Sequence, residues 1–203
     1  MSRFYSIAYA VGFTPWERAG QVDDQTLPRM FAREEGDHGG PGKALDLGCG
    51  SGAHTVELAE RGWKVTGVDL VPKALDRARK RIAEHGVAAD LVRADVTELP
   101  AQTLGTGYDF FLDIGCFHGL TPTQRTAMGA AVAALAAPDA SLLLLAFKAD
   151  AAPRPLPRGA DRAGIEAAFP GWSVTDTEAA VTDGIPKPLR KAAPTWYRLR
   201  RQS

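Results

Sequence analysis

The sequence predicts an α/β fold built around a mostly parallel sheet. From residue 43 onward, short runs rich in strand-forming residues alternate with stretches of helical pattern. This alternation is typical of strand–helix–strand crossover units, which place neighbouring strands parallel to one another. A second observation is the run over residues 140–147, which is nearly all Leu at its centre. Because continuous apolar runs are typical of strands covered on both faces, this run indicates the buried middle of the sheet.

Seven strands are expected along this stretch, over residues 43–47, 64–68, 89–93, 108–113, 140–147, 172–177 and 195–200. Helices are expected between them, over residues 54–61, 72–85, 122–137 and 161–169. Gly62 is placed to end the first helix, and Pro72 suits the first turn of the second. The third helix begins with a capping box, in which Thr121 caps, Pro122 follows and Gln124 reaches back.

The segment before residue 43 does not follow the alternation. Residues 2–11 have a helical pattern, Phe13 and Trp16 lie just beyond it, and the sequence up to Gly42 is typical of an acidic, Gly-rich linker. We therefore expect two parts, an N-terminal helical lid segment over residues 1–42 and an α/β domain over residues 43–203. The alternative for the N-terminal pattern is a static helix that only completes the core.

Composition indicates a small-molecule partner. The 203 residues include 24 basic and 24 acidic side chains, so no net charge draws the protein to nucleic acid or an anionic membrane. The two cysteines, Cys49 and Cys116, are too few for a disulfide framework and fit a reducing compartment. The most apolar stretch, residues 127–147, is interrupted by Pro138 and Asp139 and is not expected to span a membrane. We expect a cytoplasmic protein, a monomer or a weak dimer.

Nucleic acid is an unlikely partner despite a basic C-terminal region. Its cations lack interleaved stacking aromatic residues, so they are expected to form a solvated face. They are Lys187, Arg190, Lys191, Arg198, Arg200 and Arg201. The four histidines are scattered, and no metal site is expected.

A glycine-rich turn follows the first strand and predicts a nucleotide-like ligand. Residues 48–52 read Gly-Cys-Gly-Ser-Gly, which permits φ > 0 and close approach of a ligand to the backbone. The following helix offers unpaired N–H groups at its N-terminus. Asp69 ends the second strand, where a carboxylate accepts hydrogen bonds from two ribose hydroxyls. Gly48, Gly50 and Ala53 also satisfy the dinucleotide fingerprint, so these residues alone leave a nicotinamide cofactor open.

The wider pattern resembles the class I S-adenosylmethionine-dependent methyltransferases. It runs from the glycine turn through Asp69 and Asp95 to Tyr108-Asp109, and the resemblance covers residues 40–148 and the final strand. This resemblance implies a Rossmann-like seven-stranded sheet, mostly parallel, with helices on both faces and an antiparallel last strand. It also implies S-adenosylmethionine as cofactor, S-adenosylhomocysteine as product and no metal.

Carried over from that resemblance, Gly48 and Gly50 would contact the methionine part and Asp69 the ribose. Asp95 would contact the adenine amino group, and Val96 the ring face. The full set of expected cofactor-binding residues is Trp16, Asp46, Gly48, Cys49, Gly50, Asp69, Leu70, Asp95, Val96, Asp113 and Ile114. Asp46 and Asp95 have an alternative role as caps of their own turns.

A narrower resemblance concerns the acceptor side. Thr14-Pro15-Trp16, the stretch from Asp113 to His118 and Pro157-Arg158 look like the thiopurine methyltransferase-like branch, which includes heterocyclic-compound and thiol methyltransferases. By that likeness the residues facing the acceptor are Phe13, Phe117, His118 and Arg158. His118 is a candidate general base, with a locally hydrogen-bonded histidine as the alternative.

The expected function is therefore transfer of a methyl group to a small-molecule acceptor of heterocyclic, thiol or hydroxyl type. The Asn-Pro-Pro-Tyr type motif of nucleic-acid amino methyltransferases is absent at residues 113–116. Two other functions remain open, a NAD-dependent oxidoreductase and a non-catalytic cofactor-binding or RNA-associated module.

Overall fold

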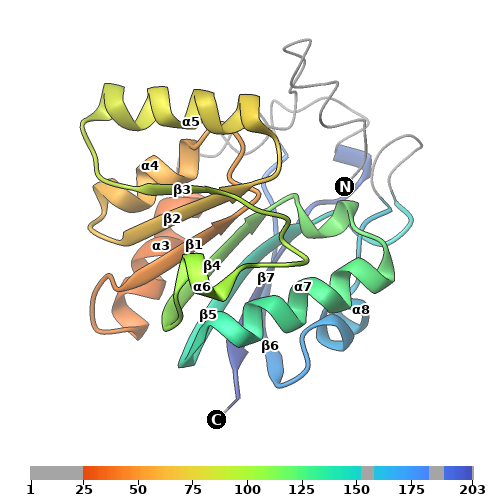
Figure 1. The fold of residues 1–203 in the computed structure, drawn as a ribbon. Helices are drawn as coiled ribbons and strands as arrows, with labels where there is room; N and C mark the ends of the chain where they lie inside the picture. The colour runs from red at the N-terminus through yellow and green to blue at the C-terminus, as the bar shows by residue number, and fades with distance from the viewer. Residues whose placement is uncertain (1–24, 152–157, 183–189, 203) are drawn as a thin grey trace.

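The computed structural model describes residues 25–151, 158–182 and 190–202. Seven strands form one sheet in the order β3-β2-β1-β4-β5-β7-β6 (Figure 1). Their bounds are β1 Lys43–Leu47, β2 Lys64–Asp69, β3 Asp90–Arg93, β4 Tyr108–Ile114, β5 Ala136–Ala146, β6 Trp172–Ala179 and β7 Thr195–Arg201. Neighbouring strands are parallel from β3 through β5, and β7 runs antiparallel to both β5 and β6. The predicted sheet, with its antiparallel last strand, is confirmed.

Helices cover both faces of this sheet (Figure 1). They are α3 Thr26–Asp37, α4 Ala53–Glu60, α5 Pro72–His85, α6 Ala101–Leu104, α7 Pro122–Leu135 and α8 Arg162–Ala168, with the short 3-10 helix η1 Phe117–Gly119. Alternate residues of one strand enter opposite cores, as expected from strand periodicity. Phe111 of β4 packs in the cluster that includes Val132 of α7, whereas Phe110 packs with Phe31 of α3 and Leu58 of α4.

The boundary between α7 and β5 differs from the prediction. The capping box of Thr121 and Gln124 is present, but the helix ends at Leu135 and the strand begins at once with Ala136. Alanine favours helix, so local propensity extended the predicted helix too far. Tertiary pairing decides instead, because Ala136 pairs with Tyr108 of β4 and its carbonyl accepts a 2.6 Å hydrogen bond from Arg201 Nη1.

Helix α3 corrects the expectation of a linker running to Gly42. Its Phe31 is fully buried, with its ring centroid 6.1 Å from that of Phe110 in β4. Its Glu34 is also buried and pairs with Arg198 of β7, at 2.5 Å from Nε and 3.0 Å from Nη2. From the sequence, the acidic residues of this segment indicated a solvated linker. The partner that allows Glu34 to be buried is Arg198, which lies 164 residues further along the chain and leaves no signal near Glu34.

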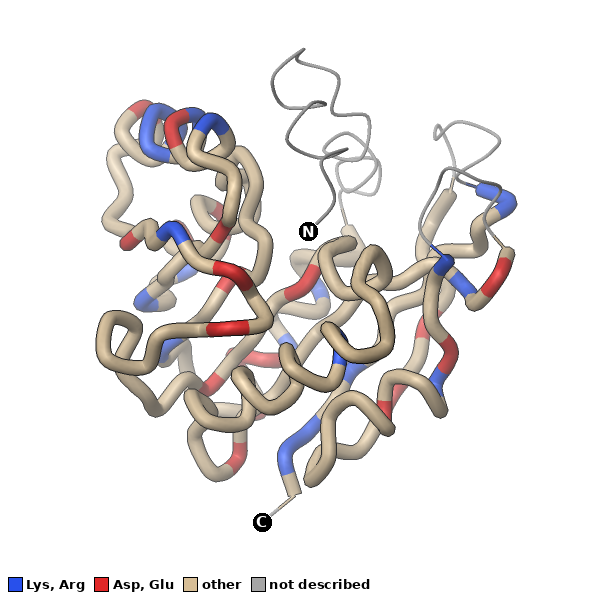
Figure 2. The backbone as a smooth tube through the Cα atoms, turned by 45° about the vertical axis from the view of Figure 1, so that its right-hand side comes forward, with Lys and Arg blue, Asp and Glu red and all other residues tan. Residues whose placement is uncertain are grey.

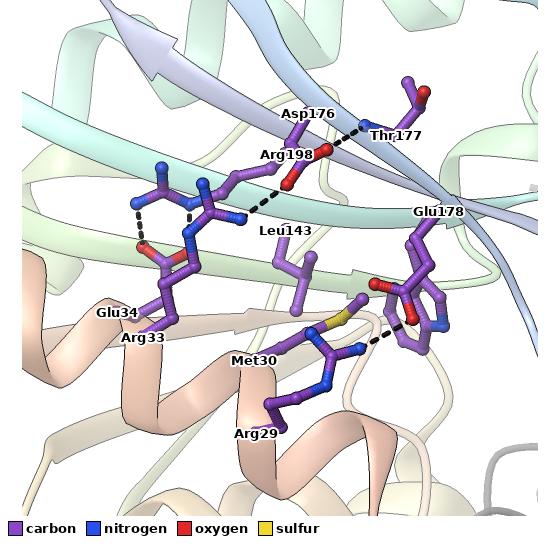
Figure 3. A pocket seen from close by; sticks show the side chains of 10 residues that line it. Arg29, Met30, Arg33, Glu34, Leu143, Asp176, Thr177, Glu178 and Arg198 are labelled. Atoms are coloured by element: carbon purple, nitrogen blue, oxygen red, sulfur yellow. Dashed lines mark hydrogen bonds and ion pairs between the residues drawn. The ribbon is translucent and has the colours of Figure 1, made fainter.

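Two further ion pairs join α3 to β6 at the edge of the sheet. Arg29 contacts Glu178 at 2.6 Å, and Arg33 contacts Asp176 at 2.5 Å (Figure 3). Helix α3 is thus fixed against the far edge of the sheet through its charged residues. Residues 1–24, with Phe13 and Trp16, lie outside the described residues, so the lid segment stays a prediction.

Helix α5 carries charged residues of both signs. Figure 2 shows blue and red segments interspersed on α5, which includes Lys73, Asp76, Arg77, Lys80 and Glu84. Among the described helices, none combines the length and apolar character needed to cross a lipid bilayer.

Candidate active site

The turn after β1 is shaped by glycines at the carboxyl edge of the sheet. Gly48, Gly50 and Gly52 have φ values of 73°, 55° and 76°, in the left-handed region that favours glycine. Helix α4 begins directly afterwards, and Gly52 at its N-cap provides no side-chain hydrogen bond. The first N–H groups of α4 therefore lack a side-chain cap, an arrangement suited to an anionic or polar ligand.

Asp69 at the end of β2 stands beside this turn. Its Oδ2 accepts a hydrogen bond from the Gly50 N–H at 3.0 Å, and its Oδ1 accepts one from the Val71 N–H at 2.8 Å. The side chain is therefore fixed in orientation beside the turn. The acid and the turn that the sequence singled out are brought together by a direct bond.

Two of the glycines are also required by packing. A Cβ atom added at Gly48 would lie 2.9 Å from the Cβ atom of Cys116, and one added at Gly52 would lie 2.8 Å from the Cβ atom of Ala78. These distances are too short for real carbon contacts. The absence of side chains at Gly48 and Gly52 thus lets the turn pack closely against Cys116 after β4 on one side and against helix α5 on the other.

Asp46 and Cys49 are buried in the base of the turn. Asp46 Oδ2 accepts a 2.6 Å hydrogen bond from Thr55 Oγ1, which ties β1 to α4. Burial raises the pKa of Asp46, while the Thr55 bond opposes that rise. Burial also raises the pKa of the Cys49 thiol. Both positions support the turn from below, and Leu70, partly buried, continues from Asp69 beside it.

Asp95 and Val96 follow β3 on the other side of Asp69. Asp95 Oδ1 accepts hydrogen bonds from the Thr97 N–H at 2.9 Å and from Thr97 Oγ1 at 2.8 Å. The turn-capping role considered for Asp95 is thus present, with the carboxylate still partly exposed. Val96 is fully buried in the apolar core, and the Ala94 N–H donates to the Asp69 carbonyl at 3.3 Å.

The turn after β4 is held by Asp113. This carboxylate is fully buried and accepts hydrogen bonds from the N–H groups of Cys116 at 2.9 Å and Phe117 at 3.0 Å. Burial raises the pKa of Asp113 to about 7, against the lowering effect of these bonds. Both oxygens are engaged by the turn itself, and Ile114 is partly buried beside them.

Phe117, expected to face the acceptor, lies in the core. It is fully buried with its ring centroid 5.5 Å from that of Phe169. The sequence placed it beside His118 and therefore near the acceptor, but η1 turns the two neighbouring side chains to different environments. Phe117 instead supports the site from beneath.

His118 is held by local contacts. Its Nδ1 accepts a hydrogen bond from the Phe147 N–H at 3.2 Å, and its ring stacks on Phe147 with centroids 4.3 Å apart. Burial lowers the pKa of His118 to about 3, with Arg125 acting in the same direction. The neutral ring must then carry its proton on Nε2 and has no lone pair left to accept another. The geometry favours the locally hydrogen-bonded alternative over a general base.

A pocket of about 500 Å³ opens where β4 and β5 end. Its described lining comprises His118, Gly119, Leu120, Thr121, Pro122, Arg125, Ala149, Asp150, Arg158, Gly159, Ala160 and Asp161. His118 and Arg158, both expected on the acceptor side, meet here although they are forty residues apart in the chain. A volume of this size suits a small organic molecule.

Arg125 is a pocket residue that sequence reasoning missed. Its Nη2 donates to the His118 carbonyl at 3.1 Å and to the Gly159 carbonyl at 2.6 Å. Its guanidinium carbon lies 4.9 Å from the ring centroid of Phe117. In the sequence Arg125 is one more polar residue in the first turns of a helix, and no local signal marks it.

The comparisons with known proteins agree with this geometry. Residues 44–139 match the family model described as a methyltransferase domain. Over these 96 of its 203 residues, the chain is similar to methyltransferase domains.

Individual relatives of the domain act on different kinds of acceptor. A 2-heptyl-1-hydroxyquinolin-4(1H)-one methyltransferase from Mycobacteroides abscessus is 34% identical over 116 residues, which are 55% of this chain and 49% of that protein. A ribosomal RNA small subunit methyltransferase C from Alcanivorax borkumensis is 34% identical over 77 residues, 38% of this chain and 24% of that protein. The chain thus spans about half or less of the length of these two relatives.

A solved structure resembles nearly the whole chain. The 1,6-didemethyltoxoflavin-N1-methyltransferase of Burkholderia thailandensis, bound to 1,6-didemethyltoxoflavin and S-adenosylhomocysteine, superposes with a TM-score of 0.71 at 22% identity. The match covers 98% of this chain and 86% of that chain. At this identity the likeness establishes the fold alone. These comparisons do not confirm the narrower resemblance to the thiopurine methyltransferase-like branch.

The surroundings of the glycine turn fit an organic cofactor of the kind that the sequence resemblance implies. The first N–H groups of α4 have no side-chain cap, and Asp69 is held in a fixed orientation beside them. The N–H groups of Gly48, Gly50 and Gly52 are themselves bonded to Val68, Asp69 and Cys49, so these glycines shape the turn. Within the described residues, no cluster of His, Cys, Asp and Glu side chains is suited to hold a metal ion.

Proposed function

We propose that this protein transfers a methyl group from S-adenosylmethionine to a small-molecule acceptor of heterocyclic, thiol or hydroxyl type. The observation that carries the proposal is the hydrogen bond joining Gly50 of the glycine turn to Asp69, at the same sheet edge as the pocket lined by His118 and Arg158. A cofactor-binding turn and a separate acceptor pocket are what a two-substrate transfer requires.

In this proposal the backbone of the glycine turn binds the methionine part of the cofactor, and Asp69 binds the ribose hydroxyls. Asp95, with its carboxylate partly exposed, binds the adenine amino group, while the buried Val96 supports the wall behind the ring. Bound S-adenosylmethionine would supply an electrophilic methyl group on a sulfonium. Asp46, Cys49 and Asp113 act by holding the two turns in shape rather than by touching the reacting atoms.

The protein contributes mainly by positioning and by excluding water. Holding two reactants in a near-attack geometry supplies on the order of 7 kcal/mol of the barrier reduction. His118 is not suited to act as a general base, because its proton-accepting nitrogen is already engaged by the Phe147 N–H. Acceptors that ionise on their own near neutral pH, or that carry a free lone pair, are therefore favoured over aliphatic alcohols.

Two observations support a small molecule over nucleic acid as the acceptor. The M. abscessus relative is named for a quinolone substrate, and its match covers more of both chains than that of the ribosomal RNA methyltransferase. The lining of the pocket also contains two cations and two acids, Arg125 and Arg158 against Asp150 and Asp161. A phosphate-binding surface would be dominated by cations.

Calorimetry tests the cofactor first. S-adenosylhomocysteine should bind to the full chain, whereas NAD should not, and the reverse result would favour the oxidoreductase. A cofactor-saturated panel of thiols, phenols and nitrogen heterocycles then tests transfer. Tight binding of S-adenosylhomocysteine with no methylated product across the panel would instead favour a non-catalytic module.

A further inference from the structure

The imidazole of His118 has one N–H group, at Nε2, that can donate a hydrogen bond to a ligand. Because its Nδ1 accepts the Phe147 N–H, its neutral form carries a proton on Nε2. Within the described part of the chain, Nε2 has no hydrogen-bond partner, and His118 is part of the lining of the pocket. The ring therefore presents a single N–H donor of fixed identity.

The direction of that donor follows from its neighbours. A Cβ atom built at Gly115 would lie 3.6 Å from His118 Nε2, so this edge of the ring faces the carboxyl end of β4. The next residue, Cys116, packs against Gly48 of the cofactor-binding turn. His118 Nε2 thus lies beside the turn that follows β4, and this turn contacts the glycine turn through Cys116.

The donor is held rigidly. The ring of His118 stacks on Phe147 with an interplanar angle of 19°, and Arg125 donates from Nη2 to the His118 carbonyl. The same Nη2 bonds to Gly159, which joins η1 to the chain before α8. Stacking and backbone anchoring together fix the imidazole, so a ligand meets a preorganised donor rather than a mobile side chain.

The charges around the pocket decide what kind of acceptor group fits. Arg125 from α7 and Arg158 from the segment after β5 are balanced by Asp150 and by Asp161 at the start of α8. The remaining wall is largely apolar, with Leu120, Pro122, Ala149 and Ala160. Such a surrounding gives an anion no net attraction, whereas a neutral oxygen pairs well with a neutral N–H donor.

We propose, on the basis of the function proposed above, that the pocket selects cyclic acceptor molecules that carry a neutral oxo group, and that His118 recognises this oxygen through its Nε2–H. His118 is then a specificity residue that orients the acceptor toward the glycine turn. The low pKa of its ring keeps it a donor, and not a cation, throughout the neutral range.

A matched pair of ring compounds tests this recognition without requiring turnover. Quinolin-4(1H)-one and quinoline differ by the oxo group and are titrated into the full chain saturated with S-adenosylhomocysteine. The wild-type protein should bind the oxo compound about tenfold more tightly, which corresponds to roughly 1.4 kcal/mol or one good hydrogen bond. This preference should stay constant between about pH 5.5 and pH 8, whereas a titrating imidazole would change it near pH 6.5.

Two variants separate donation from packing. His118→Phe keeps a ring that stacks on Phe147 but has no donor, so the preference should fall to about one. His118→Gln retains an N–H donor and should keep most of the preference. Affinity for S-adenosylhomocysteine serves as the folding control and should be unchanged in both.

A wild-type measurement keeps the test independent of the variants. The Nε2–H proton resonance of His118 should move downfield when quinolin-4(1H)-one is added and stay in place with quinoline. Failure of S-adenosylhomocysteine to bind would overturn the proposed function itself. Normal S-adenosylhomocysteine binding together with no probe binding, equal affinity for the two probes, or a preference that survives in His118→Phe would overturn the role of His118 alone.

Discussion

The turns after β1 and β4 follow adjacent parallel strands, and they differ in the origin of the carboxylate that accepts their backbone N–H groups. The β4 turn is closed by its own Asp113, whose buried carboxylate accepts the N–H groups of Cys116 and Phe117. The β1 turn has three left-handed glycines, and its carboxylate partner Asp69 comes from another strand. Helix α4 then starts without a side-chain cap.

This difference teaches which turn is built for a ligand. The β4 turn leads into η1 with its N–H groups bonded to its own Asp113, whereas the β1 turn leads into a helix whose first N–H groups have no side-chain cap and can bind a ligand. We therefore assign cofactor binding to the β1 turn and support of the pocket to the β4 turn. The following predictions test that division.

The largest effect is expected at Gly50. Gly50→Val puts a β-branched residue at φ 55° and disturbs the N–H bonded to Asp69, so calorimetry should detect no binding of S-adenosylhomocysteine. Gly86→Val is the matched control, because Gly86 has φ +65° but ends α5 with open space around it. The control should lose some stability and keep its affinity. Normal affinity in Gly50→Val would mean that the β1 turn is not the cofactor site.

The next effect concerns stability and pH at the β4 turn. The pKa of Asp113 is raised from 3.8 to about 7 in the folded protein, so between these pH values the folded state holds a proton that the unfolded state has lost. The free energy of unfolding should therefore fall as pH rises from 4 to 7, by on the order of 4 kcal/mol at most, and level off above. Asp113→Asn should remove this slope.

Urea denaturation of both proteins at pH 5 and pH 8 measures that difference. Wild type should lose stability relative to Asp113→Asn as the pH increases, while affinity for S-adenosylhomocysteine stays similar at a pH where both are folded. If the free energy of unfolding depended on pH in the same way in the two proteins, the proton on Asp113 would not contribute to stability.

A smaller loss is expected at the acid of the β1 turn. Asp69→Ala should weaken binding of S-adenosylhomocysteine by about 2–4 kcal/mol, because two hydrogen bonds to a charged group are lost with partial compensation. Asp76→Ala, at an exposed aspartate of α5, is the control and should bind normally. Unchanged affinity in Asp69→Ala would remove the ribose assignment.

The smallest effect measures the contact between the two turns. Gly48→Ala brings a Cβ atom to 2.9 Å from the Cβ atom of Cys116 and should destabilise the fold by about 1–3 kcal/mol. Cys116→Gly removes the opposing atom, so the double variant should recover about 1 kcal/mol relative to additivity. Additive unfolding free energies would indicate that backbone strain at Gly48, and not the contact, sets the cost.

Sequence patterns predicted most of the sheet because they reflect local physics. Strand periodicity, the Leu run of β5 and the capping box of Thr121 each depend on neighbouring residues, and all three are present in the fold. The glycine turn and Asp69 were also found in sequence, because left-handed turns need glycines and each of the two features directly follows or ends a recognisable strand.

Boundaries and burial required the tertiary structure. Helix α3 was mistaken for linker because its buried Glu34 is matched only by Arg198, on the last strand. The end of α7 was misplaced because strand pairing overrides the helix propensity of alanine. Within the site, the sequence could not separate Phe117 from His118, since a 3-10 turn sends one into the core and the other into the pocket.

The sequence by itself determined the fold class and the glycine turn after β1, because both depend on residues close together in the chain. Only the tertiary structure decided the hydrogen-bonding state of His118. Its Nδ1 accepts the backbone N–H of Phe147, which directly follows β5 and lies 29 residues away in the chain. The tertiary structure also decided the place of Arg125, whose partners lie in η1 and before α8. Such contacts leave no local pattern, because burial and partner are properties of the folded chain.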